Sequence, residues 1–245
     1  MRRDTSILED VAMLAVPSNR TKFYIHQMAQ HRVLPSHVLY MEDPSATTPE
    51  ERAIAQLDEA QERDQPEAFS VDVSVPASLA MHGITFQRLP SIDPNSELVV
   101  EAVASCKQPI MIYSGPGGAI LRRRLLATGK RFLHVHSGIL PDFRGSTTAY
   151  YSLLKDQRCG ATAFFLDRQI DTGPVIRSKT YPPPKDRTTI DLYYDPLIRA
   201  ELLAEVLVEY ARTGSMPTEP QESTTGETYY IIHPVLKHIA ILATD

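Results

Sequence analysis

Short apolar runs alternate with amphipathic stretches over the first 136 residues, and this alternation restricts the fold more than any other feature of the sequence. Parallel strands that follow one another in the chain need a crossover, which is usually a helix. The pattern therefore predicts an α/β protein with a Rossmann-like, mostly parallel sheet and helices on both faces. The predicted strands are 11–16, 37–41, 84–87, 109–113 and 132–136, and the predicted helices are 20–32, 77–81, 97–105 and 119–127.

The second half of the chain adds a hairpin and a long helix to this sheet. After a predicted helix at 147–154, two apolar runs at 162–166 and 175–179 are separated by an Asp/Gly/Pro turn, which predicts an edge hairpin. Apolar residues then recur at helical spacing from Ile198 to Tyr210, so we expect a helix that covers the sheet.

Two regions are too polar to add much to a core. Residues 42–69 are rich in Asp, Glu, Pro and Thr and predict at most a surface helix at 50–60. The second polar region precedes an apolar tail that we expect to dock on the domain. The expected organisation is a single α/β domain over 1–212, followed over 213–245 by a polar linker and a small docked C-terminal extension.

Composition argues against several classes of partner. The 245 residues carry a formal charge of −5 and show no basic stripe, which disfavours a nucleic-acid partner. No run approaches 18 apolar residues and no apolar leader follows Met1, so we expect no membrane partner and a cytoplasmic protein. Cys106 and Cys159 are too few for a disulfide framework, which agrees with a reducing compartment.

Two histidines at the end of a predicted strand are the strongest candidates for chemistry. His134 and His136 point to the same face because strand side chains alternate, at a separation of roughly 6 to 7 Å. The strand leads into a loop at the carboxyl end of the sheet, where open α/β sheets bind ligands. A lone strand histidine is often a structural residue, but a pair of them leading into such a loop favours a site.

A turn at 167–174 carries the second candidate group. Asp167 and Asp171 lie between two predicted strands, where one carboxylate can reach the histidines. The alternative is that Asp171 only caps its own turn, as Asp before Gly-Pro often does.

These two segments resemble a known family. The stretch from His134 to Gly145 is similar to the signature Asn-x-His-Pro-Ser-x-Leu-Pro-x-Tyr-Arg-Gly of the 10-formyltetrahydrofolate-dependent formyltransferases. The stretch from Ile170 to Pro174 resembles that family's later Asp-x-Gly-Pro turn, in the same order and spacing. The resemblance extends over residues 109–176, whereas the N-terminal half is similar only in its fold pattern.

The resemblance implies a catalytic set. The family uses an Asn, a His and an Asp, so His136 is expected as the general acid–base and Asp171 as the carboxylate that orients it and stabilises its cation. His134 stands where the family has Asn, the donor to the oxyanion. Because a ring nitrogen can also donate, and such a donor is typically worth about 3 kcal/mol, we expect His134 to take the same role.

The resemblance also implies a pocket for 10-formyltetrahydrofolate, the formyl donor, on loops 113–121 and 166–170. A glycine-rich loop suits close backbone approach, although it also suits a plain tight turn. The start of the predicted helix at 20–32 could receive an anion, or its Ser or Asn could simply cap the helix. The candidate cofactor-binding residues are Tyr113, Ser114, Gly115, Gly118, Ile120, Leu121, Leu166, Asp167 and Ile170, and the candidate substrate-binding residues are Ser18, Asn19, Arg20 and Arg144.

The implied activity is that of an N-formyltransferase, a one-carbon transferase that formylates the primary amine of a small metabolite. A nucleotide-linked amino sugar is the favoured acceptor, because the chain is acidic and short for the methionyl-tRNA branch and lacks the Gly-Asn-rich loop of the glycinamide-ribonucleotide branch. Two alternatives stay open. One is a metal enzyme that uses His134, His136 and Asp171, and the other is an inactive folate-binding homologue. Homo-oligomerisation is left open.

Overall fold

A seven-stranded sheet organises the computed structural model, which describes residues 6–43, 73–222 and 226–243. The strand order is β3-β2-β1-β4-β5-β7-β8, and all strands are parallel except β7, which runs antiparallel to β5 and β8. The predicted α/β fold with a mostly parallel sheet is confirmed. The strands are β1 (Ser6–Ala15), β2 (Val33–Met41), β3 (Thr85–Leu89), β4 (Ile110–Ser114), β5 (Arg131–His136), β7 (Cys159–Phe165) and β8 (Val175–Tyr181).

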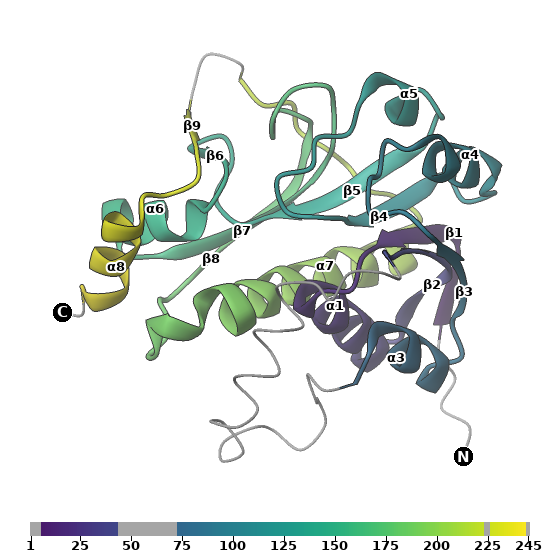
Figure 1. The fold of residues 1–245 in the computed structure, drawn as a ribbon, viewed down its shortest axis with the longest axis horizontal. Helices are drawn as coiled ribbons and strands as arrows, with labels where there is room; N and C mark the ends of the chain where they lie inside the picture. Colours follow the sequence, from purple (N-terminus) through teal and green to yellow (C-terminus); the bar gives the residue numbers. More distant parts are fainter. Residues whose placement is uncertain (1–5, 44–72, 223–225, 244–245) are drawn as a thin grey trace.

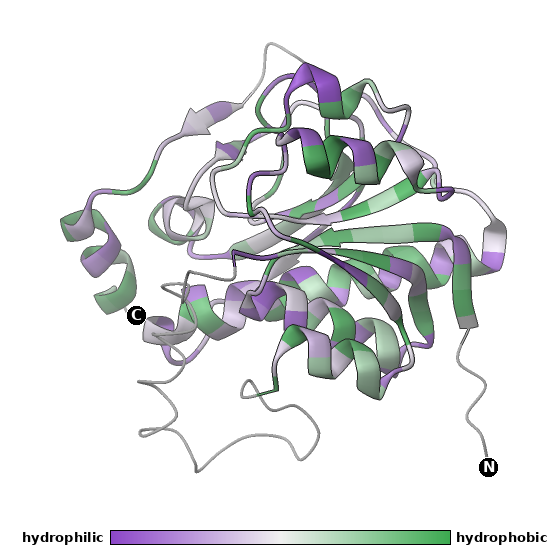
Figure 2. Ribbon diagram, turned by 45° about the vertical axis from the view of Figure 1, so that its right-hand side comes forward, coloured by the Kyte–Doolittle hydropathy of each residue, from purple (hydrophilic) through white to green (hydrophobic). Residues whose placement is uncertain are grey.

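Helices cover both faces of this sheet. α1 (Asn19–Gln30), α3 (Val75–Met81) and α7 (Asp195–Thr213) lie on one face, and α4 (Glu97–Ser105) lies on the other (Figure 1). Each face has its own apolar core, and Figure 2 shows the hydrophobic residues concentrated along the strands and the inner sides of the helices. In α7, Ile198, Leu202 and Val206 recur every four residues and are almost completely buried, as their spacing predicts.

The strand order reverses between β1 and β4, and this reversal positions the site. From β1 the chain builds β2 and β3 on one side, then returns to add β4 and β5 on the other. Ala15 at the end of β1 lies beside Ser114 at the end of β4. Ligands of open α/β sheets bind at such a reversal, outside the carboxyl ends of the strands.

The predicted helix at 119–127 is wrong in its first half, because only α5 (Arg123–Leu126) is helical. The Asn95 side chain donates to the carbonyl of Ile120 at 2.9 Å and accepts from the amide of Arg122 at 2.7 Å. These bonds hold the backbone before α5 in a non-helical loop. The surface helix predicted at 50–60 lies outside the described residues.

The C-terminal segment packs against elements that follow β5 in the chain. β9 (Glu227–Tyr229) pairs in parallel with β6 (Phe143–Gly145), which follows β5 in the chain. α8 (Pro234–Leu242) packs against α6 (Thr148–Asp156). Among the described helices, none combines the length and apolarity needed to cross a bilayer.

Candidate active site

A cavity of about 310 Å³ opens at the carboxyl ends of β4 and β5. It contains both candidate histidines and the candidate aspartate, so the structure brings together three groups that lie up to 37 positions apart in the chain. Its other walls come from the glycine-rich loop after β4, the turn after β7 and the C-terminal segment. The lining residues are Arg20, Tyr113, Gly115, Pro116, Gly117, Gly118, Ala119, Ile120, Leu121, His134, His136, Gly145, Ser146, Leu166, Asp167, Gln169, Ile170, Asp171, Thr228, Tyr229, Tyr230 and Ile231.

His136 is fixed at both ring nitrogens. Nε2 lies 2.7 Å from the carbonyl oxygen of Phe143, and Nδ1 lies 3.4 Å from Oδ2 of Asp171. Because a carbonyl only accepts, Nε2 must carry a proton. The other nitrogen is then the one that gains and loses a proton, and it does so next to a carboxylate.

Asp171 is held in place by the backbone. Its Oδ2 accepts from the amide of Gly145 at 2.8 Å, and its own backbone is left-handed, with φ of 53°. Asp is among the few residues that adopt this conformation readily. Gly173 makes the turn possible, since a Cβ there would overlap the carbonyl of Phe165.

The surroundings keep His136 neutral at rest. Burial lowers the pKa of His136, and the carboxylate of Asp171 and the carbonyl of Phe143 oppose part of that shift. A buried cation, Arg199, adds to the lowering of this pKa. A neutral imidazole beside a carboxylate can take a proton from a bound group and is stabilised by that carboxylate once it is charged.

His134 occupies the strand position two residues before His136 and lines the same cavity. Its Nδ1 lies 3.1 Å from the carbonyl oxygen of Tyr113 on the neighbouring strand. Its ring contacts the rings of Tyr113 and Phe164, with centroids 5.8 and 5.9 Å away. The ring is therefore oriented by β4 on one side and β7 on the other.

The glycine-rich loop after β4 forms a wall of the cavity. Gly118 has φ of 74°, a conformation that favours glycine, and Gly115 packs against the ring of Tyr113, where any Cβ would clash. The Tyr113 hydroxyl is buried and has no hydrogen-bond partner among the described residues. Burial raises the pKa of Tyr113 to about 12, so this hydroxyl stays protonated and can donate.

The family assignment rests on the sequence itself. Residues 5–201 match the family described as formyl transferase. The chain belongs to this formyl transferase family. The resemblance carried by the two motifs is thereby confirmed.

The sequence relatives of this chain include methionyl-tRNA formyltransferases. The protein from Roseiflexus sp. (strain RS-1) is 34% identical over 108 residues, which are 43% of this chain and 33% of the relative. The protein from Halorhodospira halophila (strain DSM 244 / SL1) is 32% identical over 153 residues, or 60% of this chain and 47% of the relative. The matched region thus spans a third to a half of these relatives.

Solved structures share the fold. The N-formyltransferase from Helicobacter canadensis, in complex with folinic acid and dTDP-3-aminofucose, has a TM-score of 0.58 at 15% identity, covering 91% of this chain and 71% of that one. Glycinamide ribonucleotide transformylase 1 from Symbiobacterium toebii has a TM-score of 0.57 at 15% identity, covering 87% and 95%. At these identities the likeness concerns the fold.

Every residue predicted to bind the donor lines the cavity, except Ser114. Ser114 is fully buried, and its hydroxyl bonds Thr21 Oγ1 at 2.9 Å and accepts from Nε of Arg20 at 3.2 Å. It joins the ends of β1 and β4 beneath the cavity floor, so it supports the neighbouring loop from below.

Of the residues predicted to bind substrate, only Arg20 lines the cavity, and its guanidinium also donates to the carbonyl of Gly115. Ser18 accepts from the amide of Thr21 and is the N-cap of α1. Asn19 donates to the carbonyl of Leu192 at 3.0 Å. The helix-capping alternative thus describes Ser18.

Arg144 is buried away from the cavity lining. Its Nη2 donates to Oε1 of Gln221 at 3.2 Å and to the carbonyl of Glu222 at 3.4 Å. Gln221 in turn donates to the carbonyls of Asp171 and Gly173, at 3.0 and 2.7 Å. Arg144 therefore links the C-terminal segment to the turn that carries Asp171.

Sequence reasoning missed two contributors to the site. Residues 228–231 line the cavity through the pairing of β9 with β6, and the sequence predicted only that this tail docks. Arg199 lies beneath the histidines, where Nε donates to the carbonyl of Val135 at 2.7 Å and Nη1 pairs with Asp195 at 3.1 Å. Only its place on the buried face of a predicted helix, four residues after Asp195, could have indicated this cation.

The metal alternative gains no support. Within residues 6–43, 73–222 and 226–243, no group of three or more His, Cys, Asp and Glu side chains is arranged to hold a metal ion. Nε2 of His136 is committed to a carbonyl, and Nδ1 of His134 to another.

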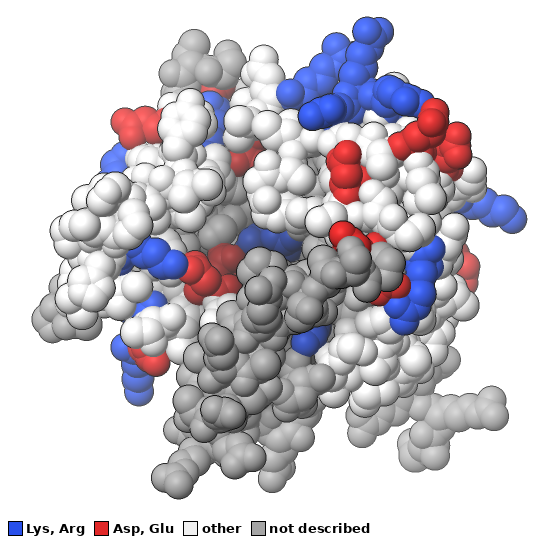
Figure 3. All heavy atoms as spheres, in the orientation of Figure 1, with Lys and Arg blue, Asp and Glu red and all other residues white. Residues whose placement is uncertain are grey.

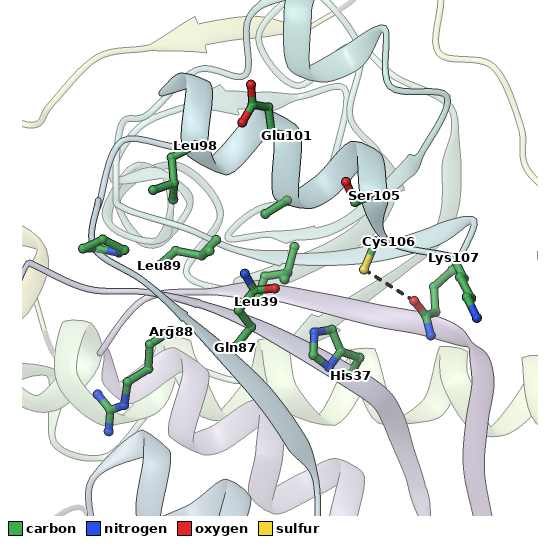
Figure 4. A pocket seen from close by; sticks show the side chains of 13 residues that line it. His37, Leu39, Gln87, Arg88, Leu89, Leu98, Glu101, Ser105, Cys106 and Lys107 are labelled. Atoms are coloured by element: carbon green, nitrogen blue, oxygen red, sulfur yellow. Dashed lines mark hydrogen bonds between the residues drawn. The ribbon is translucent and has the colours of Figure 1, made fainter.

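A larger cavity of about 530 Å³ lies apart from the first one, between β2, β3 and α4 (Figure 4). His37 there bonds Oγ1 of Thr85 at 3.3 Å, and Cys106 donates to Oε1 of Gln108 at 3.4 Å. Burial lowers the pKa of His37 and raises the pKa of Cys106, so the imidazole is neutral and the thiol is not activated.

Proposed function

We propose that the protein transfers a formyl group from 10-formyltetrahydrofolate to a primary amine of a small metabolite. The observation that carries the proposal is the buried His136–Asp171 pair, with one imidazole nitrogen tied to a carbonyl and the other 3.4 Å from the carboxylate. Formyl transfer needs one group that removes a proton from the attacking amine and returns it to the leaving nitrogen. A neutral imidazole beside a carboxylate is suited to both steps.

The cavity fits such a donor. Gly117 and Gly118 leave open space beside the loop, where no heavy atom lies within 4 Å of a Cβ position. Ile120 and Ile170 are exposed large apolar side chains on two walls, and they can cover the faces of an aromatic ring system. The bound donor supplies a formyl carbon whose bond to nitrogen can break.

His136 handles the proton in this reaction. As the amine attacks the formyl carbon, a new C–N bond forms and the carbonyl electron pair moves to oxygen. Nδ1 of His136 takes a proton from the amine, and the imidazolium pairs with Asp171. Nδ1 then returns this proton to the leaving nitrogen. The electron pair on oxygen re-forms the carbonyl as the bond to that nitrogen breaks, and the leaving nitrogen keeps the electron pair of the broken bond. Atoms and charges balance, because no net proton is gained or lost.

The proposed acceptor is a small amine, with a nucleotide-linked amino sugar favoured. Arg20 provides a cation on the cavity wall, next to the amino end of α1, where an anionic group is stabilised. Tyr230 and Ile231 are 77% and 80% exposed on the opposite wall and can stack on a base or sugar ring. The solved Helicobacter canadensis enzyme is a complex with dTDP-3-aminofucose, which has both features.

A methionyl-tRNA acceptor is the second candidate, and the sequence relatives favour it. The face shown in Figure 3 has one cluster of basic side chains over α5, and acidic and basic groups are mixed elsewhere on it. Arg122, Arg123 and Arg124 are exposed there, and Arg124 pairs with Glu97 at 3.3 Å. Three neighbouring cations can neutralise only a few phosphates, so this cluster gives a tRNA acceptor little electrostatic support.

The test is a formylation assay. The protein is incubated with 10-formyltetrahydrofolate and, separately, dTDP-3-aminofucose, glycinamide ribonucleotide and methionyl-tRNA, and N-formyl products are measured by mass spectrometry. We expect product with a small amine and none with His136→Ala, whereas the surface variant Glu209→Gln keeps the wild-type rate. Absence of product with every acceptor, together with folate binding, would establish the inactive folate-binding alternative.

A further inference from the structure

The protonation of His134 follows from its contact with β4. Nδ1 lies 3.1 Å from the carbonyl oxygen of Tyr113, and a carbonyl offers only lone pairs. This contact is a hydrogen bond only when the proton is on Nδ1. A neutral imidazole has a single N–H, so Nε2 then carries a lone pair. Among the described residues, Nε2 has no hydrogen-bond partner.

The environment keeps this ring neutral. Burial lowers the pKa of His134 well below its usual value, and the positive charges of Arg199 and Arg20 and the neighbouring His136 lower it further. The carbonyl of Tyr113 is the opposing influence. The ring contacts two aromatic rings, that of Tyr113 at an interplanar angle of 54° and that of Phe164 at 75°. Nε2 therefore stays an acceptor at neutral pH and cannot donate to an oxyanion.

We infer that Nε2 of His134 accepts a hydrogen bond from the incoming amine and so positions the amine nitrogen against His136. This inference rests on the proposed function, and it replaces the oxyanion-donor role expected from the family's Asn. The two imidazoles occupy positions i and i+2 of β5, roughly 6 to 7 Å apart along the strand. Side chains that share a strand face at this spacing can both contact one small group bound between them.

The arrangement sets a requirement on the acceptor. One N–H of the amine bonds Nε2 of His134, the other N–H is directed to Nδ1 of His136, and the amine lone pair remains free for attack. Two N–H groups are present in a primary amine, whereas a secondary amine has one. His134 is thus a specificity-determining residue that selects primary over secondary amines, and we expect a preference of about 10- to 100-fold, the range for a buried acceptor left unpaired.

The tautomer is tested directly by NMR on the full chain labelled with ¹⁵N-histidine. The eight histidines of the chain are resolved in long-range ¹H–¹⁵N spectra, and the signal lost in His134→Asn or His134→Gln identifies His134. We expect a protonated Nδ1 and an unprotonated Nε2 from pH 8 down to pH 6. A protonated Nε2 in that range would overturn the inference, whatever the activity of the protein.

Kinetics separate the acceptor role from the donor role. Rates with 10-formyltetrahydrofolate are measured for methylamine and dimethylamine, in the wild type, His134→Leu and the remote control His37→Gln. An acceptor role predicts that His134→Leu raises KM for methylamine and removes the preference for the primary amine, while His37→Gln changes neither. An oxyanion donor predicts instead that kcat falls by about 10² to 10³ for both amines and the preference persists. If the wild type formylates neither these amines nor any acceptor of the formylation assay but shows the Nδ1–H tautomer, the proposed function fails and the hydrogen-bond assignment stands.

Discussion

Replacing Asp171 with Asn removes the charge that stabilises protonated His136 and leaves the local backbone intact. Asn also adopts the left-handed conformation, and its Oδ1 can accept from the amide of Gly145 as Oδ2 of Asp171 does now. At 3.4 Å, two unit charges attract by about 5 kcal/mol at an effective dielectric constant of 20. This attraction is an upper limit on the loss, because water near the imidazolium replaces part of it. Opposite charges at such distances shift a pKa by about 1 to 3 units.

The expected effect on rate follows from this shift. The imidazolium that forms as the amine loses its proton is destabilised by about 1.4 to 4 kcal/mol, so kcat/KM falls by about 10- to 10³-fold. Because the charge of Asp171 raises the pKa of His136, its loss lowers that pKa. The acidic limb of the pH–rate profile, where the base becomes protonated, therefore moves to lower pH while the plateau drops.

The assay is kcat/KM for N-formyl product between pH 4.5 and 9, with melting temperatures measured in parallel. The control is Glu209→Gln, which also neutralises one carboxylate but lies on the outer surface of α7, paired with Arg212. An Asp171→Asn protein with full activity and an unshifted acidic limb would remove Asp171 from the mechanism.

Three further results are expected. His136→Ala lowers kcat by at least about 100-fold with little change in melting temperature, and near-normal turnover would show that the acid–base group lies elsewhere. Tetrahydrofolate and 5-formyltetrahydrofolate raise the melting temperature of the wild type, and Ile120→Asp abolishes that shift; an equal shift in both proteins would place the donor outside this cavity. The folded-state pKa of His134 lies below its unfolded value, so the contribution of His134 to the free energy of unfolding is full above about pH 6.5 and declines as the pH falls below it. Calorimetry should show a smaller decline of stability with falling pH in His134→Asn than in the wild type.

The sheet could be predicted because its strands are short apolar runs separated by helices of ordinary length. The candidate pair could be predicted in part, since His136 ends one strand and Asp171 lies on the turn after a later strand. The position of Asp171 in the structure also depends on its hydrogen bond from the backbone of Gly145, which composition and periodicity do not indicate. The prediction of helix at 119–122 is wrong for a similar reason. The Asn95 side chain, which is distant in the sequence, forms hydrogen bonds with the backbone of Ile120 and Arg122 and holds it in a non-helical loop.

The roles of His134 and the C-terminal segment lay beyond the reach of the sequence for another reason. A histidine can donate or accept from either nitrogen, and the choice is made by a carbonyl on a different strand. Likewise, residues 228–231 line the cavity because β9 pairs with β6, and these two segments are more than 80 positions apart in the chain. Long-range pairing of this kind has no signature in composition or periodicity.

The pairing of β9 with β6 also fixes when the site comes into being during protein synthesis. The sheet, His136 and Asp171 have all left the ribosome before residues 227–231 are made, so the nascent domain has an unfinished cavity wall. At about 5 to 20 residues per second, the 59 positions between Asp171 and Tyr230 correspond to about 3 to 12 s of translation. During that interval the unpaired edge of β6 is exposed, and a chain interrupted before residue 227 would keep its acid–base pair but leave that pair open to bulk water.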